Sequence, residues 1–327
     1  LLELVCGPAT SAAAVRAVSD FADVKLGKSV VVCKDTPGFI ANRIGIYWLQ
    51  CSVALAMERG LLIEEADAVI GRPMGIPKSG VFGLLDMVGL DLMPHVLTSM
   101  AESLAPDDPF HEIYREPELV RDLVARGYTG RKGKGGFYRL KPGVEEKIKE
   151  SLDLESGEYR KSVKPRLKSV AAGKRKGLRA LVEHGDKGGA YAWDVLSRTL
   201  SYAARLLPEI ADDITAVDEA MRLGYNWKYG PFELIDKLGA AWFRDRLRSA
   251  GRDVPPLLEA VGDGSFYRTV EGRLQHFTPD GHYRDVVRPD GVLLLSDIKR
   301  RSRPLAHNRS ASIWDIGDGV LCLEFHS

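Results

Sequence analysis

The stretch Asp35–Arg43 reads Asp-Thr-Pro-Gly-Phe-Ile-Ala-Asn-Arg and separates two segments of different character. Before it, Ser29–Cys33 (SVVVC) is a β-branched run, which is typical of a buried strand. After it, a largely apolar segment continues to Glu58 and indicates one long helix. Pro37 is favoured in the first turn of a helix, and Gly38 allows the backbone to turn sharply there. The stretch therefore predicts a junction where the chain leaves a sheet and enters a helical domain.

The residues upstream of this junction indicate the end of a parallel sheet. Leu1–Val5 reads as a core strand that the sequence enters midway, and Gly7–Thr10 is a turn that can cap a helix starting near Ser11. Strand, helix and strand within about 35 residues form the βαβ-type arrangement of a doubly wound sheet. We expect residues 1–35 to be the last unit of a Rossmann sheet, and both ends of the sequence to be cuts through larger domains.

Composition narrows the class of protein. The 327 residues are 45% hydrophobic and 28% charged, which fits a soluble globular protein of two or three domains. A formal net charge of +1 gives no electrostatic footprint for nucleic acid or a membrane surface. The apolar segment Gly38–Met57 contains Asn42, Arg43 and Gln50, so we expect a buried helix and no membrane span. The four cysteines form no C-x-x-C pair, so no metal site is predicted, and reduced thiols favour a cytoplasmic protein.

The pattern beyond the long helix stays helical to about Ala125, with breaks at Gly71–Pro73 and Ala105–Asp107. Arg131–Tyr138 (RKGKGGFY) is a basic, glycine-rich segment that ends in two aromatic residues. Residues 141–185 are highly charged, so we expect a linker with one or two solvated helices. A binding site for an anionic partner on this segment is the alternative.

An internal repeat follows. Each copy has an aspartate upstream of a glycine-bounded string, namely Ala66–Val69 (ADAV) with Gly80–Gly89 (GVFGLLDMVG) and Val217–Ala220 (VDEA) with Gly230–Gly239 (GPFELIDKLG). The copies are offset by 151 residues at Asp67 and Asp218, and by 150 at Asp86 and Asp236. One residue of slippage is what a loop tolerates. The repeat therefore predicts two copies of one helical unit.

The pattern of the sequence changes from helical to β-like at about Gly262. Short β-like runs such as Gly264–Arg268 and Gly291–Leu295 follow, with Asp-Gly turn signals between them. Residues 297–311 are basic and irregular, which favours a linker. Ser312–Phe325 predicts a hairpin with Gly317–Gly319 as its turn, and this hairpin is expected to begin another domain.

Three motifs in this order resemble 3-hydroxyacyl-CoA dehydrogenases: the stretch Asp35–Arg43, the G-x-F-x-L-L-D-x-V-G string and the segment Arg131–Tyr138. The tail Ile313–Phe325 resembles the first hairpin of an enoyl-CoA hydratase of the crotonase type. These resemblances imply a mainly α fold, with tandem helical dehydrogenase C-terminal domains, a Rossmann remnant before them and short β segments after them. The implied domains are 1–35 (end of the NAD-binding Rossmann domain), 36–140 (first helical domain), 141–185 (charged linker), 186–260 (second, degenerate repeat), 261–311 (β-rich linker) and 312–327 (start of a crotonase-like domain).

The resemblance also implies site residues. In that family a histidine takes the proton from the substrate 3-hydroxyl while hydride passes to NAD, a glutamate orients the histidine, and an asparagine hydrogen-bonds the substrate. Asn42 matches the asparagine and Glu3 the glutamate, whereas the histidine and the G-x-G-x-x-G cofactor fingerprint are absent from this sequence. These residue types suit the chemistry, because histidine titrates near neutrality, a carboxylate fixes its tautomer and a carboxamide donates without titrating. Lys132 matches a lysine that reaches NAD, although Gly133-Lys134 replaces the usual Thr-Gly after it.

The second copy differs from the first at the asparagine. With an offset of 151, Asn42 corresponds to Trp193, and an indole cannot replace the carboxamide. We therefore expect the second copy to be non-catalytic and to pack against the first, on the surface that a partner subunit covers in single-repeat relatives. Asp86 and Asp236 are expected to brace a helix turn in each copy, because a duplicated position is a poor catalytic candidate when one copy lacks the asparagine.

The implied function is oxidation of 3-hydroxyacyl-CoA to 3-oxoacyl-CoA with NAD in fatty-acid β-oxidation, by a fragment that is inactive alone. The expected partners are an acyl-CoA, the rest of the Rossmann domain, a crotonase-like domain and a second copy of the chain. One alternative is a non-catalytic assembly module of a multifunctional β-oxidation protein. Another is a dehydrogenase of the 6-phosphogluconate or 3-hydroxyisobutyrate type, but those use a lysine on the helix after the sheet, and 36–58 contains none.

Overall fold

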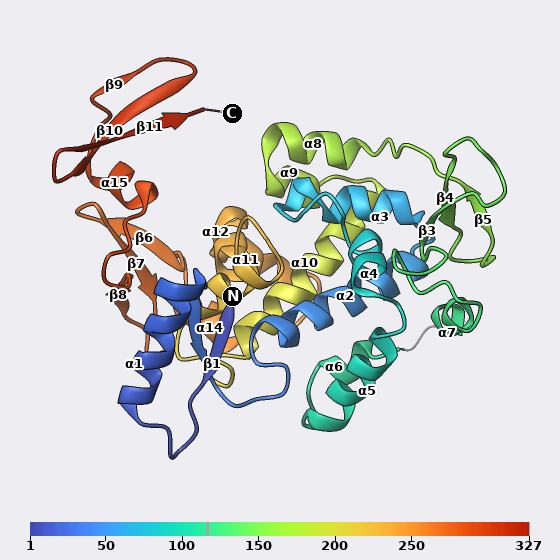
Figure 1. The fold of residues 1–327 in the computed structure, drawn as a ribbon, viewed down its shortest axis with the longest axis horizontal. Coiled ribbons are helices and arrows are strands. Elements are labelled where there is room, and N and C mark those ends of the chain that lie inside the picture. Colours follow the sequence, from blue (N-terminus) through green and yellow to red (C-terminus); the bar gives the residue numbers. More distant parts are fainter. Residues whose placement is uncertain (116–117, 327) are drawn as a thin grey trace.

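The computed structural model describes residues 1–115 and 118–326 and confirms a mainly helical architecture with small sheets (Figure 1). The helices are α1 (Ala12–Asp20), α2 (Ala41–Glu58), α3 (Ile63–Ile70), α4 (Phe82–Val88), α5 (Met93–Ser103), α6 (Phe110–Ile113), α7 (Glu118–Ala125), α8 (Lys168–Lys176), α9 (Leu178–Val182), α10 (Lys187–Arg205), α11 (Ile214–Gly224), α12 (Pro231–Leu238), α13 (Ala240–Ser249), α14 (Pro256–Val261) and α15 (Leu295–Arg301). The strands are β1 (Leu2–Val5), β2 (Val30–Cys33), β3 (Tyr138–Leu140), β4 (Lys149–Leu152), β5 (Tyr159–Lys161), β6 (Tyr267–Val270), β7 (Arg273–Phe277), β8 (Tyr283–Asp285), β9 (Ala306–His307), β10 (Ala311–Gly317) and β11 (Val320–Phe325). Within the described ranges, no helix is long and apolar enough to cross a membrane.

The N-terminal residues form a β1–α1–β2 unit whose two strands run parallel, with Glu3 opposite Val31. Ser11 caps α1, because its side chain accepts a hydrogen bond from the backbone N–H of Ala14 at 3.2 Å. The prediction of a buried strand holds for one face of β2 only. Val31 is 3% exposed, whereas Val32 on the opposite face is 50% exposed. A two-stranded sheet cannot cover both of its own faces, since successive side chains point to opposite sides.

The predicted long helix is α2, but it begins at Ala41 and not at Pro37. Gly38 and Phe39 both have positive φ angles, 75° and 51°, and a right-handed helix cannot pass through such residues. A side chain at Gly38 would also lie 2.9 Å from the backbone N of Arg43. The residues before Ala41 therefore form a tight turn, and only glycine fits at its closest approach to the helix.

Residues 41–161, here called the first unit, contain α2–α7 and end in the antiparallel sheet β3-β4-β5. The predicted linker 141–185 is more structured than expected, because it contains β4, β5, α8 and α9, and Leu152 and Leu181 are fully buried. Strands of three or four residues that carry several charges lack a clear apolar alternation, so the sequence pattern did not predict them. α8 is solvated as predicted, since only Ser169 and Gly173 of its nine residues are buried.

Residues 187–285, here called the second unit, contain α10–α14 and end in a second antiparallel sheet, β6-β7-β8. The strand order matches that of β3-β4-β5, so this sheet repeats the end of the first unit. The boundary expected at residue 260 therefore divides the repeated architecture. The expectation of a β-like run at Gly291–Leu295 is wrong, since these residues form no strand and Leu295 begins α15. This helix extends into the basic segment 297–311, which was predicted to be irregular.

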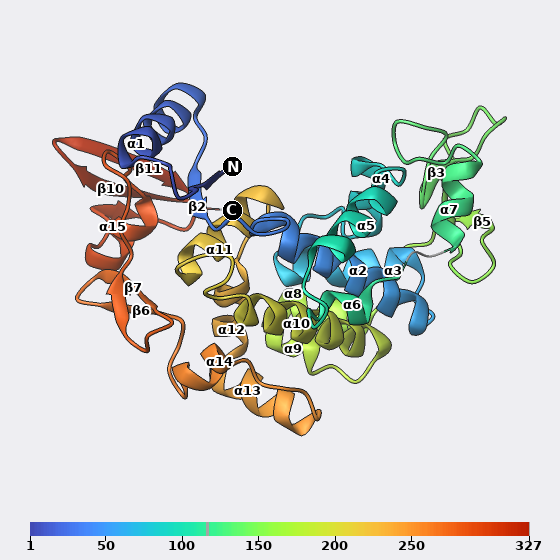
Figure 2. The same cartoon turned by 90° about the horizontal axis from the view of Figure 1, so that it is seen from below.

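The two units pack against each other through α2 and α10, which lie side by side in both ribbon views (Figures 1 and 2). The rings of Tyr47 and Tyr202 stack with centroids 3.9 Å apart, and the Tyr191 hydroxyl donates to the backbone carbonyl of Ser52 at 2.8 Å. The helices run antiparallel, since Ser52 follows Tyr47 on α2 whereas Tyr191 precedes Tyr202 on α10. The expected mutual burial of the two units is confirmed.

The position equivalent to Asn42 needs correction. Residues 59–62 separate α2 from α3, whereas the longer loop 206–213 separates α10 from α11, so the offset of 151 does not hold in the first helix. Asn42 is the second residue of α2, and the second residue of α10 is Gly188. Trp193 instead lies inside α10, is 7% exposed and packs edge to face on Phe243 at 5.7 Å. None of the residues 187–190 at the start of α10 has a carboxamide side chain, so the second unit lacks the equivalent of Asn42.

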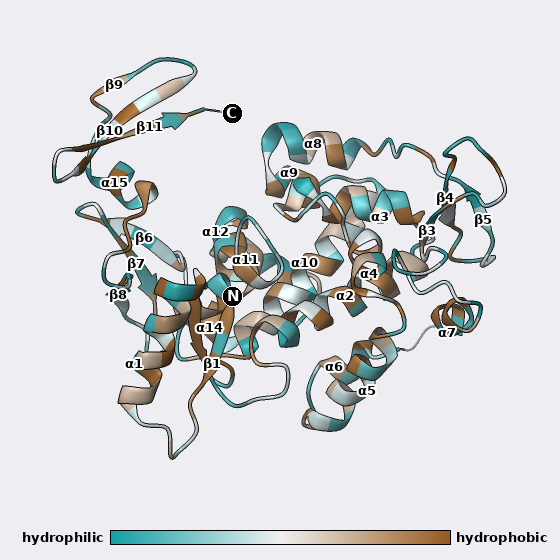
Figure 3. Cartoon of the chain, in the orientation of Figure 1, coloured by the Kyte–Doolittle hydropathy of each residue, from teal (hydrophilic) through white to brown (hydrophobic). Residues whose placement is uncertain are grey.

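The C-terminal hairpin forms as predicted. β10 and β11 pair antiparallel and turn after Gly317. Apolar residues of both strands are visible in brown in Figure 3, and Leu321, Leu323 and Phe325 of β11 are 59%, 54% and 77% exposed. These alternate residues lie on one side of β11, so the hairpin presents an apolar face that the described part of the chain leaves open.

Candidate active site

Glu3 on β1 reaches the start of α2. Its Oε1 atom accepts hydrogen bonds from the backbone N–H groups of Ile40 and Ala41, each at 2.9 Å. The first N–H groups of a helix have no partner within the helix, and they carry the positive end of its dipole. A carboxylate satisfies both needs, so Glu3 joins the two-stranded sheet to the helical domain. Within the described chain Glu3 Oε2 accepts no hydrogen bond, and this oxygen remains available.

Asn42 occupies the same turn of α2. Its side chain is exposed, whereas its neighbours Ala41 and Arg43 are buried, 4% and 2% exposed. The helix thus directs Ala41 and Arg43 into the protein and leaves the Asn42 carboxamide free to meet another molecule. The structure brings Glu3 and Asn42, which are 39 positions apart in the sequence, to adjacent places at one helix start.

Cys33 ends the neighbouring strand β2 and is buried. Its thiol lies 3.8 Å from the carbonyl oxygen of Leu4. Burial raises the pKa of the Cys33 thiol to about 11, and the nearby charge of Glu3 raises it further in the same direction. The thiol is therefore neutral near pH 7 and is not a nucleophile in this site.

Tyr225 is a site neighbour that sequence patterns did not single out. It follows α11 in the second unit, and a side chain at Gly45 of α2 would lie 2.0 Å from its ring. The aromatic ring therefore packs directly on the backbone of α2, one turn after Asn42. Burial raises the pKa of the Tyr225 hydroxyl, and the charge of Glu3 adds to this effect. No local sequence motif predicts this contact, because it joins residues from the two units.

Lys132 lies elsewhere. It is an exposed residue in the turn between α7 and β3, and Figure 1 shows β3 near the right-hand end of the molecule, well away from β1. The turn is fixed by a hydrogen bond from the backbone N–H of Arg131 to the carbonyl oxygen of Asp86 at 2.7 Å. No contact within the described residues brings Lys132 to Glu3 or Asn42. The two predicted catalytic residues, Glu3 and Asn42, lie at the same helix start, whereas no contact brings the predicted cofactor residue Lys132 to them.

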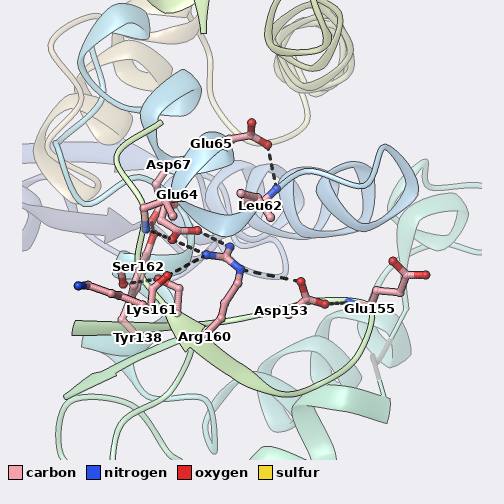
Figure 4. A network of polar contacts seen from close by, with 12 residues as sticks. Leu62, Glu64, Glu65, Asp67, Tyr138, Asp153, Glu155, Arg160, Lys161 and Ser162 are labelled. Atoms are coloured by element: carbon pink, nitrogen blue, oxygen red, sulfur yellow. Dashed lines mark hydrogen bonds and ion pairs between the residues drawn. The ribbon is translucent and has the colours of Figure 1, made fainter. Parts of the chain in front are cut away.

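Two buried aspartates of the first unit have structural partners. Asp67 accepts hydrogen bonds from the backbone N–H groups of Val81, Phe82 and Gly83, and from the Tyr138 hydroxyl at 2.7 Å (Figure 4). Burial raises the pKa of Asp67 to about 7, although these donors lower it. Because every oxygen has a donor within the fold, Asp67 stabilises the chain and takes no part in the site.

Asp86 has a similar role. It accepts hydrogen bonds from the backbone N–H groups of Phe137 and Tyr138 at 2.7 and 2.8 Å. Burial raises the pKa of Asp86 to about 6. The expectation that Asp86 braces a helix turn is wrong, because its carboxylate binds the backbone at the beginning of β3 instead.

A charged cluster beside Asp67 ties β5 to α3. Arg160 donates to both carboxylate oxygens of Glu64, at 2.9 and 2.7 Å, and the backbone N–H of Val163 donates to Glu64 Oε1 at 2.9 Å (Figure 4). Burial raises the pKa of Glu64, but these hydrogen bonds outweigh burial, and the pKa lies below its ordinary value. The cluster explains why part of the charged segment 141–185 is docked on the first unit.

The first unit also contains a small apolar cavity of about 30 Å³. Its lining residues come from α2, α4, α5, α7, the loop between α4 and α5, and the residue before β3, and they are Leu49, Gln50, Val53, Leu85, Leu90, Met93, Pro94, Leu97, Val120 and Phe137. A volume of this order holds about one or two water molecules. The cavity is therefore too small for an acyl chain.

Comparison with known proteins identifies the class to which this fold and helix start belong. The sequence model of the family described as "3-hydroxyacyl-CoA dehydrogenase, C-terminal domain" matches residues 38–140 and again residues 189–283. The chain therefore belongs to the 3-hydroxyacyl-CoA dehydrogenase family. The second match extends past residue 260, in agreement with the repeated sheet.

Two relatives align with the whole or nearly the whole of this chain. It is 36% identical over 332 residues to the probable 3-hydroxyacyl-CoA dehydrogenase of Bacillus subtilis, a match that covers 100% of this chain and 42% of that protein. It is 29% identical over 323 residues to the putative fatty acid oxidation complex trifunctional enzyme of Rickettsia felis, covering 99% of this chain and 43% of that protein. The chain thus spans less than half the length of these relatives.

One solved structure shares the fold. The crystal structure of 3-hydroxybutyryl-CoA dehydrogenase from Escherichia coli aligns with a TM-score of 0.53 and 22% sequence identity. The alignment covers 79% of this chain and 66% of that one. At this level of identity the likeness supports the fold and not the substrate.

Proposed function

We propose that this chain is part of an NAD-dependent oxidoreductase that converts 3-hydroxyacyl-CoA into 3-oxoacyl-CoA in fatty-acid β-oxidation. The observation that carries the proposal is that Glu3 binds the backbone N–H of Ala41, the residue directly before the exposed Asn42. Membership of the family supports the reaction class, because relatives that match the full chain are named for it. An assembly module without catalysis would need neither the exposed carboxamide of Asn42 nor a carboxylate whose second oxygen accepts no hydrogen bond from the described residues.

In the proposed mechanism Asn42 binds the substrate. Its carboxamide donates a hydrogen bond to a substrate oxygen that gains electron density as the reaction proceeds, and it does so without titrating. Glu3 acts indirectly, through a histidine. Its Oε1 is held by the N–H groups of Ile40 and Ala41, so Oε2 is oriented and can accept the ring N–H of a histidine from residues outside this chain. The helix start thereby positions both groups.

NAD would supply the acceptor for the hydride, but the residues of this chain do not make up its site. The sequence contains no G-x-G-x-x-G, and no contact within the described residues joins Lys132 to the start of α2. No hydride step is therefore assigned to this chain. Lys132 stays a predicted contact to NAD, and the contact requires the rest of the protein to bring cofactor and turn together.

We also propose how the chain fits into a longer protein. Residues 1–35 would complete a Rossmann sheet, and the exposed apolar residues Val32, Phe21 and Val24 mark the faces that this sheet would cover. Residues 312–327 would begin a crotonase-like domain packed on β11. Tandem helical domains at 36–140 and from 186 onward lie between them. A cytoplasmic location and association of two copies are part of the same proposal.

The second unit is proposed to be non-catalytic. The second residue of α10 is Gly188, and a side chain there would lie 2.5 Å from Ser169 Oγ and 2.9 Å from Leu167 Cδ1. The start of α10 is thus covered by residues just before and within α8. No substrate has access to this helix start, in contrast to that of α2.

The test is oxidation of NADH with acetoacetyl-CoA by the extended chain, which is this chain preceded by its natural upstream residues. We expect activity in the extended chain and a loss of at least about 100-fold in Asn42→Ala. Asn42→Asp is the matched control variant, because it keeps the shape and removes the donor. It should be as inactive as Asn42→Ala while folding normally. An inactive extended chain that still binds the other parts of the protein would favour the assembly module instead.

A further inference from the structure

The second unit contacts the first next to the start of α2, which carries Asn42, through a loop that is longer than its counterpart in the first unit. Eight residues, 206–213, connect α10 to α11, whereas four residues, 59–62, connect α2 to α3. In a duplicated scaffold, an insertion confined to one copy calls for an explanation specific to that copy. The contacts of the longer loop supply one.

The loop 206–213 binds the backbone just before the turn. The backbone N–H of Lys34 donates to the carbonyl oxygen of Ile210 at 3.0 Å, and the Lys34 ammonium pairs with Asp212 at 2.5 Å. Ile210 is fully buried, so its carbonyl needs a partner and Lys34 provides it. The loop also carries Glu209, whose carboxylate lies 3.4 Å from the Arg43 guanidinium. One loop of the second unit thereby contacts the chain on both sides of the turn.

Arg43, the residue after Asn42, is held by a second group of contacts. Its guanidinium is 2% exposed, and its Nε donates to the Tyr202 hydroxyl of α10 at 2.5 Å. The Tyr202 hydroxyl in turn donates to Asp108 at 3.0 Å, and Asp108 pairs with Arg43. A further N–H of Arg43 donates to the carbonyl oxygen of Pro37 at 3.4 Å, inside the turn itself. A buried charge is tolerated only when it is fully paired, so this set of contacts allows little movement.

We propose that the second unit is a positioning element for the active site of the first: Tyr202 and the loop 206–213 hold the turn 35–40 and the first turn of α2 in the orientation that Asn42 needs. The inference rests on the proposed function of Asn42. It gives the degenerate copy a task in the reaction of the other copy. Tyr202, Asp108 and Arg43 are positioning residues, since their side chains are buried and bond one another.

The test compares two tyrosines of α10 in the extended chain. Tyr202→Phe and Tyr191→Phe each remove one buried hydroxyl that bonds the first unit, but Tyr191 bonds the carbonyl oxygen of Ser52 in the middle of α2. We expect Tyr202→Phe to lower kcat about tenfold with KM for acetoacetyl-CoA changed less than about twofold. Both variants should lower the melting temperature by similar amounts, whereas Tyr191→Phe should leave kcat unchanged.

A second readout does not depend on activity. Amide hydrogen exchange of a peptide covering 38–46 should accelerate at least about tenfold in Tyr202→Phe and stay at the wild-type rate in Tyr191→Phe. Equal exchange and equal kcat in the two variants would overturn the positioning role. An inactive wild-type extended chain would overturn the proposed function instead, and the exchange comparison would still decide whether Tyr202 holds the turn.

Discussion

In the first unit Asp67 binds the backbone N–H groups at the start of α4, and in the second unit Asp218 binds those of Phe232 and Glu233 at the start of α12. The next aspartate in each unit behaves the same way. Asp86 holds the start of β3, and Asp236 accepts from Phe266 and Tyr267, at 2.7 and 2.8 Å, at the start of β6. These four carboxylates fix the same helix-to-sheet geometry twice.

The aromatic packing repeats as well. The rings of Phe82 and Phe137 meet edge to face at 4.7 Å, and those of Phe232 and Phe266 at 4.9 Å. Each unit also places an arginine 3.6 Å from a tyrosine ring in its sheet, Arg139 on Tyr159 and Arg268 on Tyr283. The two copies thus retain the contacts that build the core and the sheet.

The units differ where a substrate can approach. The start of α2 is capped by Glu3 from another part of the chain and exposes Asn42, whereas the start of α10 is capped by its own Asp186, which accepts from Gly189 at 2.9 Å. Asp186 also accepts from the backbone N–H of Ser169, which draws α8 over the helix start. The comparison teaches that the scaffold and the chemistry of this fold rest on separate residues, so a copy can lose one and keep the other.

The largest expected effect tests whether the shared scaffold is equally important in both units. Asp67→Ala and Asp218→Ala should each lower the free energy of unfolding by about 3–5 kcal/mol, because buried N–H groups and a tyrosine hydroxyl lose their acceptor. Urea denaturation of the extended chain measures both. The exposed Asp107→Ala is the control and should cost under about 0.5 kcal/mol. A small loss in Asp218→Ala alone would mean that the second unit no longer depends on the shared network.

The next prediction separates chemistry from packing at the two helix starts. Asn42→Ala should reduce turnover at least about 100-fold without lowering stability, because Asn42 is exposed. Gly188→Ala should instead destabilise the protein by about 1–3 kcal/mol through overpacking and leave the turnover of the folded protein unchanged. Steady-state kinetics and thermal melts on both variants decide the matter. A loss of turnover in Gly188→Ala would give the second helix start a role in the reaction.

A smaller effect is expected from pH. Burial raises the pKa of both Asp86 and Asp236 to about 6, so in each unit the native state binds a proton more tightly than the unfolded state. The resulting stability is fully present below the unfolded pKa and is lost as pH rises through about 6. Relative to Asp86→Asn or Asp236→Asn, the wild-type free energy of unfolding should therefore increase by about 1 kcal/mol between pH 7 and pH 5. Urea titrations at both pH values measure it, and opposite responses in the two variants would contradict the equivalence of the units.

The smallest effect sharpens the comparison of the two sheets. Arg139 donates to the buried Glu150 and to the Tyr128 hydroxyl, both at 2.8 Å, whereas Arg268 donates only to Gln275 among its hydrogen-bond partners, at 2.9 Å, within the described residues. Arg139→Ala should therefore cost about 1 kcal/mol more than Arg268→Ala. Melting temperatures of the two variants give the difference. Equal losses would show that the ring contact dominates in both sheets.

Much of the fold was accessible from local sequence. The stretch Asp35–Arg43 predicted the passage from strand to helix, and the repeated aspartates predicted two units that bury each other. The repeated Phe-Tyr-Arg after a glycine-rich segment, 137–139 and 266–268, was an unused signal for the two sheets. The offset of 151 failed in α10 because the loop 206–213 is longer than 59–62, and a loop length is not visible in motifs that lie on either side of it.

The sequence by itself determined the family, the two units and the residue types at the start of α2, since these depend on short motifs whose backbone needs are local. Tertiary structure decided what those residues touch. It brought Glu3 onto the N–H groups of Ile40 and Ala41, and it set Tyr202 of the second unit against Arg43 beside Asn42. Such contacts join positions far apart in the chain, and they form because buried donors and charges must be paired wherever packing places them.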